Sequence, residues 1–288
     1  MPEMPEVEGL AGFLRERAVG RTVAAVEIGA ISALKTFSPA PTDLVGREVS
    51  AVARHGKWLD VVTSGDGEAL HLVFHLAKAG WLRWYDTVPR TVLRPGRSPI
   101  ALRVRLDDGA GFDLTEAGTR KRLAVHVVPR AEAVEAIATL GVEPADLTPE
   151  RLRELLTARN QQVKGLLRDQ SVIAGIGNAY SDEILHAARI SPFALTRSFD
   201  DGTTTRLHEA IHEVLASAVE QASGKPAAEL KDSKRRSMRV HGRAGQACPV
   251  CGDTVREVSF ADSSLQYCPT CQTDGKVLAD RRMSKLLR

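Results

Sequence analysis

The spacing of apolar residues changes about halfway along the chain. Between Val23 and Val128 they fall in short runs, separated by turn sequences such as Ser64–Gly67 and Asp107–Gly111. Short apolar runs with no helical pattern between them predict a β-sandwich or barrel. We expect strands in this half of the chain at Val49–Ala53, Leu59–Val62, Leu70–Leu76, Ile100–Leu106 and Leu123–Val128.

Helical spacing dominates after a linker that contains Pro129 and Pro144 with a weak helix between them. Thr148 followed by Pro149 is a plausible capped helix start, because proline is favoured at the first helical position. The polar, lysine-rich stretch Ser223–Ser237 is predicted to be a loop. One earlier helix, Val7–Ala18, is expected to pack on the sheet, and the later helices are expected at Thr148–Thr157, Val163–Leu167, Asn178–Ala188 and Thr204–Ala222.

The four cysteines all lie in one short window, as Cys248-Pro-Val-Cys251 and Cys268-Pro-Thr-Cys271 with sixteen residues between the pairs. Two CxxC knuckles at this spacing bring four thiolates to one point, which is the arrangement that zinc prefers. A redox pair is the alternative interpretation. The intervening stretch can form a β-hairpin, so we expect a zinc ribbon with one structural Zn²⁺.

Charge is unevenly distributed. Residues 231–288 carry twelve Lys/Arg and six Asp/Glu, a net +6, so residues 1–230 carry −3 of the total of +3. A basic segment suits a polyanionic partner, although a solvated basic tail has the same composition. The sequence contains no long uncharged apolar run, so we expect a cytoplasmic protein with no membrane partner.

The chain begins Met1-Pro2-Glu3-Met4-Pro5-Glu6. A small second residue favours removal of Met1, which would expose the secondary amine of Pro2. An α-amino group has a pKa of about 8, so a fair fraction is unprotonated at neutral pH and can attack a sugar C1′ to form an iminium ion. Glu3 could then act as a general acid and Glu6 could orient water or support Glu3. A disordered acidic N-terminus is the alternative interpretation.

Taken together, these segments resemble the formamidopyrimidine-DNA glycosylase / endonuclease VIII family, whose N-terminus reads MPE(L/M)PEVE. Four further segments resemble family motifs in the same order along the chain. These are Arg54-His55-Gly56-Lys57-Trp58-Leu59, His75-Leu76-(x)3-Gly80-(x)-Leu82-Arg83, Gln170-Ser171-Val172-Ile173-Ala174-Gly175-Ile176-Gly177-Asn178-Ala179-Tyr180, and Val240-His241-Gly242-Arg243. The resemblance spans nearly the whole chain.

The resemblance implies a base-excision-repair DNA glycosylase with abasic-site lyase activity, acting through an N-terminal proline Schiff base on a flipped nucleotide. It makes Pro2, Glu3, Glu6 and Lys57 the catalytic set. Pro2 is the nucleophile and Glu3 the acid, Glu6 has a weaker role, and Lys57 also contacts phosphate near the lesion. Gly175 and Gly177 would present backbone N–H groups to a phosphate at a helix N-terminus. The DNA-binding set is then Lys57, Lys164, Gly175, Gly177, Asn178 and Arg243, and the metal set is Cys248, Cys251, Cys268 and Cys271.

The sequence departs from the family at the residues that grip DNA around the lesion. Ser263 stands where many members carry a fingertip arginine, and Lys78 stands where many insert a methionine into the duplex. The PRRFG segment has no clear counterpart in Thr115–Arg122. Arg256 or the basic tail, with Lys276, Arg281, Arg282, Lys285 and Arg288, is a candidate replacement for the fingertip.

We therefore predict an α+β multidomain protein that acts as a monomer on damaged duplex DNA and associates with the nucleoid through that binding. The expected parts are a catalytic β-sandwich domain with a helix (1–129), a linker (130–146), a helical domain with a helix–two-turn–helix motif (147–237), a zinc ribbon (238–273) and a basic tail (274–288). Two alternatives are an enzyme that is mainly an abasic-site lyase with little base excision, and a non-catalytic damaged-DNA-binding protein. Intact Pro2, Glu3 and Lys57 argue against the second.

Overall fold

The computed structural model describes residues 1–94, 98–117, 121–260 and 263–278. The chain divides into two compact units. Unit 1 comprises Met1–Leu140 and Ala222–Lys231, and unit 2 comprises Gly141–Gln221 and Asp232–Arg288. Among the described residues, no helix combines the length and the apolar character needed to cross a membrane.

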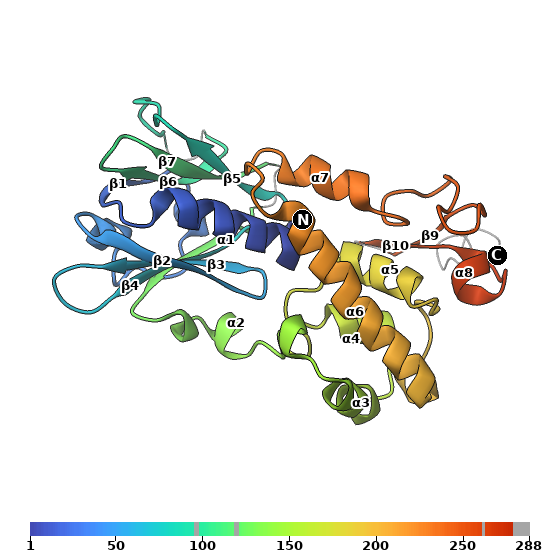
Figure 1. Cartoon of the computed structure of the whole chain (residues 1–288). Helices are drawn as coiled ribbons and strands as arrows, with labels where there is room; N and C mark the ends of the chain where they lie inside the picture. Colours follow the sequence, from blue (N-terminus) through green and yellow to red (C-terminus); the bar gives the residue numbers. More distant parts are fainter. Residues whose placement is uncertain (95–97, 118–120, 261–262, 279–288) are drawn as a thin grey trace. The chain divides into compact units, whose positions relative to one another are not determined.

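Unit 1 is a sandwich of two antiparallel four-stranded sheets (Figure 1). One sheet has the order β2-β3-β4-β8 and the other the order β1-β6-β7-β5. The helical elements of the unit before residue 141 are α1 (Met4–Ala18), α2 (Glu135–Ala138) and the 3₁₀ turns Ile31–Ala33, Pro41–Leu44 and Ala131–Ala133. The strands are β1 (Val23–Ile28), β2 (Glu48–His55), β3 (Trp58–Ser64), β4 (Leu70–His75), β5 (Gly80–Tyr85), β6 (Ile100–Leu106), β7 (Gly111–Glu116) and β8 (Ala124–Val128).

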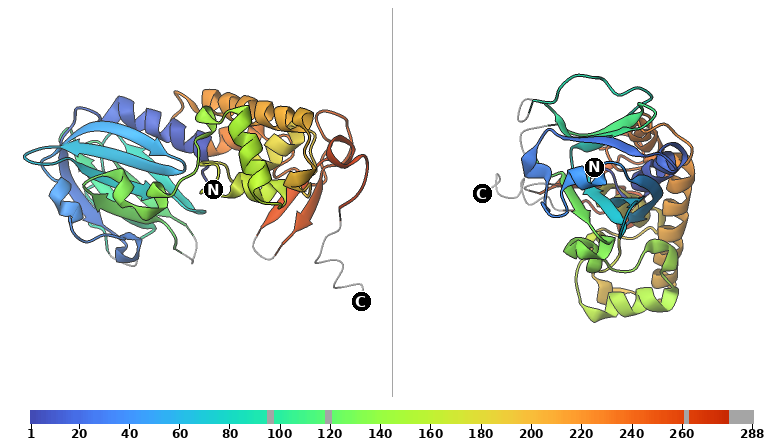
Figure 2. Two further views of the ribbon diagram at one scale, coloured as in Figure 1. Left: turned by 90° about the horizontal axis from the view of Figure 1, so that it is seen from below. Right: turned by 90° about the vertical axis from the view of Figure 1, so that its left-hand side faces the viewer.

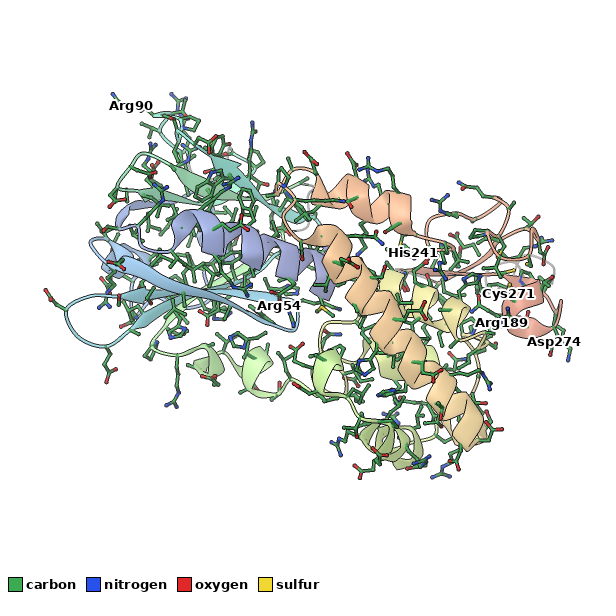
Figure 3. All side chains as sticks on the ribbon, in the orientation of Figure 1. Arg54, Arg90, Arg189, His241, Cys271 and Asp274 are labelled. Carbon is green, nitrogen blue, oxygen red and sulfur yellow. The ribbon has the colours of Figure 1, made fainter. Side chains whose placement is uncertain are left out.

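The core of unit 1 joins α1 to both sheets. Leu10 and Leu14 of α1 are fully buried, as are Phe74 of β4 and Leu114 of β7. Polar groups fix the helix on β2, since Glu8 of α1 accepts a hydrogen bond from Arg54 Nε at 2.8 Å. The Arg54 side chain is labelled in Figure 3. The N-terminal helix is thereby held by its apolar stripe and by one ion pair.

Residues 222–231 return to unit 1 after a long excursion of the chain. The Ala227 carbonyl accepts a hydrogen bond from Trp81 Nε1 at 3.0 Å, and the Lys231 ammonium lies 4.4 Å from the centre of the Trp81 ring. Leu230 is buried at 1% exposure. Leu230–Ser237 forms helix α7, so the predicted loop at Ser223–Ser237 is wrong for these residues.

Unit 2 is helical and ends in a small β-hairpin module (Figure 2). Thr148 caps α3 as expected, with its hydroxyl accepting from the Arg151 N–H at 3.1 Å and Pro149 in the first turn. The hairpin pairs Val258 with Leu265. The elements are α3 (Pro149–Ala158), α4 (Val163–Arg168), α5 (Asn178–Ala187), α6 (Asp201–Ala222), β9 (Arg256–Ser259), β10 (Ser264–Tyr267), α8 (Pro269–Thr273) and the 3₁₀ turns Pro144–Asp146 and Thr196–Ser198.

Candidate active site, DNA-contacting groups and zinc site

The N-terminus is built into unit 1. Pro2, Glu3 and Glu6 are buried, and Glu3 is the residue that caps α1. The Glu6 carboxylate accepts a hydrogen bond from the Glu3 backbone N–H at 2.8 Å. Carboxylates at a helix N-terminus are stabilised by the helix dipole. The segment is therefore ordered and capped, which contradicts the alternative of a disordered acidic tail.

Lys57 lies in the β2–β3 turn, directly before β3, and is 8% exposed. Gly56, with φ of 55°, makes this tight turn possible. Burial, with a smaller contribution from the Lys57 charge, lowers the pKa of His75 to about 4. The ring is therefore neutral at physiological pH.

His75 is a candidate site residue that the sequence analysis does not assign. Its Nδ1 accepts from the Ala77 N–H at 3.2 Å, which leaves the proton on Nε2, and its ring lies 4.9 Å from that of Trp58. His75 thus presents a fixed neutral N–H donor beside a lysine. Its position in the segment His75-Leu76 that resembles the family was the available signal.

The β4–β5 turn presents the residue that replaces the wedge methionine. Lys78 is exposed at this turn, and Ala77 before it adopts a left-handed conformation with φ of 51°. Gly80 closes the turn, because a Cβ there would lie 2.1 Å from the Leu76 carbonyl oxygen. An ammonium group, rather than a thioether, therefore stands at the tip of this turn.

The segment without a PRRFG counterpart continues from β7. Glu116 is buried at 3% exposure, and its carboxylate accepts from the backbone N–H groups of Arg122 at 2.7 Å and Leu123 at 3.1 Å. These bonds tie the end of β7 to the start of β8. Residues 118–120 lie outside the described residues.

In unit 2, the turn before α5 is organised by a glutamine. Gln170 donates from Nε2 to the Ile176 carbonyl at 2.8 Å and accepts at Oε1 from the Gly175 N–H at 3.0 Å. Gly175 has φ of 84°, a conformation that suits glycine, and Gly177 caps α5. In this structure the Gly175 N–H, which the sequence predicts as a donor to phosphate, donates to Gln170.

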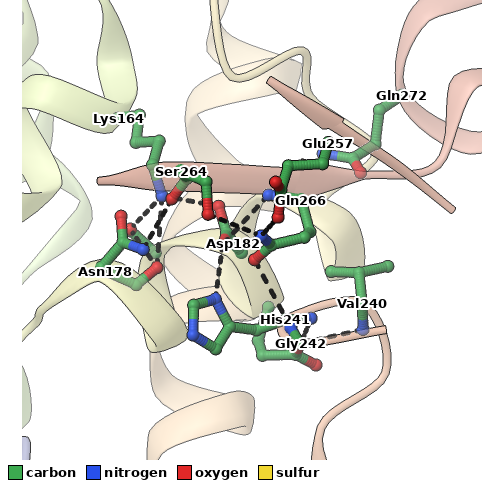
Figure 4. Close-up of polar contacts among 12 residues, drawn as sticks. Lys164, Asn178, Asp182, Val240, His241, Gly242, Glu257, Ser264, Gln266 and Gln272 are labelled. Carbon is green, nitrogen blue, oxygen red and sulfur yellow. Dashed lines mark hydrogen bonds and ion pairs between the residues drawn. The ribbon is translucent and has the colours of Figure 1, made fainter. Parts of the chain in front are cut away.

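Lys164 is buried in a polar network rather than presented at the surface (Figure 4). Its ammonium donates to Asp182 Oδ1 at 2.5 Å, to Ser181 Oγ at 2.7 Å and to the Asn178 carbonyl at 3.2 Å. Asp182 is fully buried, and its Oδ2 lies 2.7 Å from His241 Nδ1. The network holds the first turn of α5 and fixes the His241 ring.

Asn178 and Arg243, two further predicted DNA contacts, make bonds within unit 2. Asn178 Nδ2 donates to the Ser264 carbonyl at 2.8 Å, which joins α5 to β10, while its buried Oδ1 has no hydrogen-bond partner among the described residues. The Arg243 guanidinium donates to the carbonyls of Arg236 and Met238. Cations at a helix C-terminus satisfy its last carbonyls, so Arg243 stabilises the end of α7.

Ser263, at the fingertip position, precedes β10 and accepts at its carbonyl from the Phe260 N–H at 2.7 Å. Two of the candidate replacement cations, Arg256 and Lys276, are exposed. The remaining tail cations lie outside the described residues: Arg281, Arg282, Lys285 and Arg288.

The four cysteines converge as the sequence predicts. All four sulfur atoms lie within 4.8 Å of one another, with 3.3 Å between Cys251 and Cys268 and 3.9 Å between Cys248 and Cys271. Thiolates around tetrahedral zinc lie about 3.8 Å apart for Zn–S bonds of about 2.3 Å, so the group fits the ion. His186 Nε2 lies 3.3 Å from Cys248 Sγ and supports this ligand from outside. This is a closed structural zinc site.

Three family models match successive parts of this chain, and all three describe formamidopyrimidine-DNA glycosylase domains or the zinc finger found in FPG and IleRS. Residues 1–125 match the model of the formamidopyrimidine-DNA glycosylase N-terminal domain, residues 140–228 its H2TH domain, and residues 245–273 the zinc finger found in FPG and IleRS. A formamidopyrimidine-DNA glycosylase of Chloroflexus aurantiacus is 34% identical over 94% of this chain and 98% of its own. A formamidopyrimidine-DNA glycosylase-like protein of Mycobacterium tuberculosis is 58% identical over 52% of this chain and 94% of its own.

Solved structures agree. A Lactococcus lactis Fpg bound to N7-benzyl-Fapy-dG DNA has a TM-score of 0.82 and 25% identity, covering 94% of this chain and 100% of that one. The same protein bound to abasic-site DNA has a TM-score of 0.81 and 25% identity, covering 94% and 99%. Sandwich, helical unit and zinc finger together define a DNA-repair glycosylase. The chain belongs to the formamidopyrimidine-DNA glycosylase family, which confirms the resemblance, the fold class and the structural zinc.

Proposed function

We propose that this chain is a DNA glycosylase that also cleaves abasic sites, with the Pro2 amine as its nucleophile. The observation that carries the proposal is the buried, capped N-terminus, in which Pro2 immediately precedes Glu3 and Glu6 at the start of α1. Removal of Met1 frees a secondary amine at this point. A surface tail would not need a buried glutamate as the helix cap.

The proposed reaction begins when the Pro2 nitrogen attacks C1′ of the damaged nucleotide. The glycosidic bond breaks and the base leaves with the proton that the attacking Pro2 N–H gives up, while Glu3 protonates the sugar ring oxygen as the ring opens to an iminium ion. Loss of a C2′ proton then expels the 3′ phosphate by β-elimination. Water hydrolyses the iminium and regenerates the amine, with Glu6 supporting Glu3 or orienting water.

The proposed substrate is damaged duplex DNA, bound by a monomer. The family's solved relatives in complex with lesion-containing DNA support this partner. In this proposal Lys57 contacts a phosphate near the lesion, and Gly177 and Asn178 contact the backbone at the N-terminus of α5. Residues 1–129 supply catalysis, 147–237 and the ribbon 238–273 bind DNA, and the tail 274–288 adds positive charge.

A second candidate is an enzyme that mainly cleaves preformed abasic sites and excises few bases. Two residues favour it: Lys78 at the wedge turn and Ser263 at the fingertip both lack the family's lesion-gripping groups. An abasic site has already lost its base, so it requires less unstacking than an intact lesion.

Borohydride trapping tests the nucleophile. The processed protein, incubated with abasic-site duplex and borohydride, is expected to form a covalent adduct whose crosslinked peptide begins at Pro2. An extra N-terminal tag should abolish both trapping and cleavage. Equal cleavage by tagged and processed protein would disprove the Pro2 mechanism.

Glu3→Gln separates the two candidate functions. If Glu3 protonates the sugar during base release, this change should reduce release from lesion duplexes more than cleavage at preformed abasic sites. The unmodified protein is also assayed on a panel of single-lesion oligonucleotides and on abasic duplex. Turnover of the abasic duplex alone would favour the second candidate. Binding without any turnover would support a non-catalytic damage-binding protein instead.

A further inference from the structure

Two histidines of α6 lie against a backbone carbonyl in unit 2, next to the Thr148 cap of α3 and apart from the candidate active-site and zinc-site residues. His208 and His212 are one helical turn apart, with ring centres 4.4 Å apart and Nε2 atoms 3.1 Å apart. Both Nε2 atoms also lie close to the Leu147 carbonyl oxygen, at 2.7 Å and 3.0 Å. Three polar atoms therefore form a small triangle with every side at hydrogen-bond distance.

Hydrogen bonds can satisfy at most two sides of this triangle. The Leu147 oxygen is only an acceptor, so both Nε2 atoms must carry a proton to bond with it. Both N–H groups then point at the oxygen, and the two nitrogen atoms lie 3.1 Å apart with no hydrogen bond between them. If one Nε2 is unprotonated, it can accept from the other but can no longer bond with the carbonyl oxygen. Every neutral arrangement therefore leaves one side without a hydrogen bond.

A cation that accepts a lone pair from all three atoms would engage all of them at once. Metal–nitrogen bonds of about 2.05 Å place neighbouring ligands about 2.9 Å apart at right angles and about 3.4 Å apart in a tetrahedron. The observed separations, from 2.7 to 3.1 Å, match the right-angle geometry. Imidazole nitrogens with oxygen ligands in such geometry suit Ni²⁺ or Cu²⁺.

A carboxylate lies within electrostatic range of His208. Hydrogen bonds with its own backbone N–H and with Thr148, and the charge of Arg153, lower the pKa of Glu150. Glu150 is therefore anionic near the His208 ring. It can balance the charge of a bound cation, while water completes the coordination because both imidazoles are only half-buried.

We propose that His208 Nε2, His212 Nε2 and the Leu147 carbonyl form a second metal site, which takes a divalent transition ion with octahedral or tetragonal geometry. The ion joins the middle of α6 to the residue that precedes the Thr148 cap of α3. It shares no ligand with the cysteine site. The bound ion therefore cross-links α6 to the start of α3 within unit 2.

The test uses tag-free, full-length protein with its zinc ribbon loaded, equilibrated with Ni²⁺ by dialysis and analysed for both metals. We expect one Ni²⁺ per chain in addition to one zinc. His208→Gln and His212→Gln should each weaken Ni²⁺ binding by more than about 100-fold, beyond the 10–100-fold that loss of a supporting outer partner costs. Ni²⁺ should raise the unfolding temperature of the unmodified protein but of neither variant.

His71→Gln is the matched control, because His71 is also half-buried and lies 2.9 Å from an oxygen of Asp60. It should bind Ni²⁺ as the unmodified protein does. Zinc content and far-UV circular dichroism establish that each variant is folded. Absence of stoichiometric Ni²⁺ in the unmodified protein, or equal binding after either α6 substitution, would overturn the proposal and leave a hydrogen-bonded histidine pair.

Discussion

Lys164→Met tests whether this lysine stabilises unit 2 or contacts DNA. The sequence predicts a DNA contact, whereas the structure places the ammonium against Asp182, Ser181 and the Asn178 carbonyl. Methionine keeps most of the apolar stem and removes the charge. The substitution therefore leaves the Asp182 carboxylate buried without its ammonium partner.

The magnitude follows from burial. Lys164 is 6% exposed and Asp182 is fully buried, and removing one member of a buried ion pair costs about 3–5 kcal/mol. Asp182 retains His241 and the Gln266 N–H as hydrogen-bond partners. The expected loss is therefore about 3 kcal/mol, the lower end of the range. With a urea dependence of about 2 kcal/mol per molar, the midpoint should fall by about 1.5 M.

Urea unfolding followed by two signals measures this loss. The three tryptophans all lie in unit 1, so their fluorescence reports that unit, while far-UV circular dichroism follows the helices of unit 2. The midpoint from circular dichroism should fall. Lys276→Met, at an exposed lysine, should change it by less than about 0.5 kcal/mol. The double variant Lys164→Met/Asp182→Asn should recover part of the loss, because no unpaired buried carboxylate remains.

The salt dependence of DNA binding distinguishes a lysine that contacts phosphate from a lysine that stabilises unit 2. A lysine that contacts phosphate contributes about one unit to the slope of log affinity against log salt. Lys164→Met should leave this slope unchanged at a urea concentration where the protein is folded. A slope reduced by about one, together with a stability loss as small as that of Lys276→Met, would refute the structural role.

Three further outcomes are expected. Cys251→Ala should abolish zinc binding, as measured by metal analysis, and should unfold the ribbon, because metal binding and folding are coupled in the ribbon. Tryptophan fluorescence of unit 1 should stay unchanged. Stoichiometric zinc retained by the variant would contradict the four-thiolate site. Ser263→Arg should steepen the salt dependence of DNA affinity by about one unit if the fingertip lacks a phosphate contact, and an unchanged slope would show that this position lies away from the backbone. His75 has a folded pKa of about 4 against an ordinary value of 6.5, so only the unfolded chain takes up its proton between these values. The free energy of unfolding should therefore fall by about 3 kcal/mol as the pH drops from 6.5 towards 4. When unfolding is measured across this pH range, His75→Gln should lose less stability than the unmodified protein. An identical loss in both proteins would contradict a buried neutral ring.

Elements with a strong local pattern are predictable from the sequence. The expected strand Ile100–Leu106 matches β6, and the capped helix start at Thr148 is observed, because these depend on alternation and on helix-capping chemistry within a few residues. Helix α7 is not predictable in this way. Leu230 is the only buried apolar residue of this helix, and the residues that follow it are polar. The sequence therefore shows no helical spacing of apolar residues that would predict α7.

The roles of site residues are likewise predictable only where they depend on nearby sequence. The cysteine spacing alone predicts the metal, because four ligands of one kind in two knuckles allow few other arrangements. The role of Lys164 depends on Asp182, which is eighteen residues away on another helix, and on His241 beyond it. A lysine's sequence neighbours do not reveal whether its charge is neutralised by a carboxylate inside the fold.

The return of residues 222–231 to unit 1 has a consequence for dissecting the protein. Because the chain passes between units at 140–141, 221–222 and 231–232, no single cut yields two intact pieces. A fragment that ends at Leu140 would lack Leu230, which packs near Gly9 of α1, and the Ala227 carbonyl that accepts from Trp81. It would expose apolar surface of its first helix near Gly9 and is expected to aggregate. Conversely, a protease nick within 138–142 should leave the halves non-covalently associated until denaturant is added.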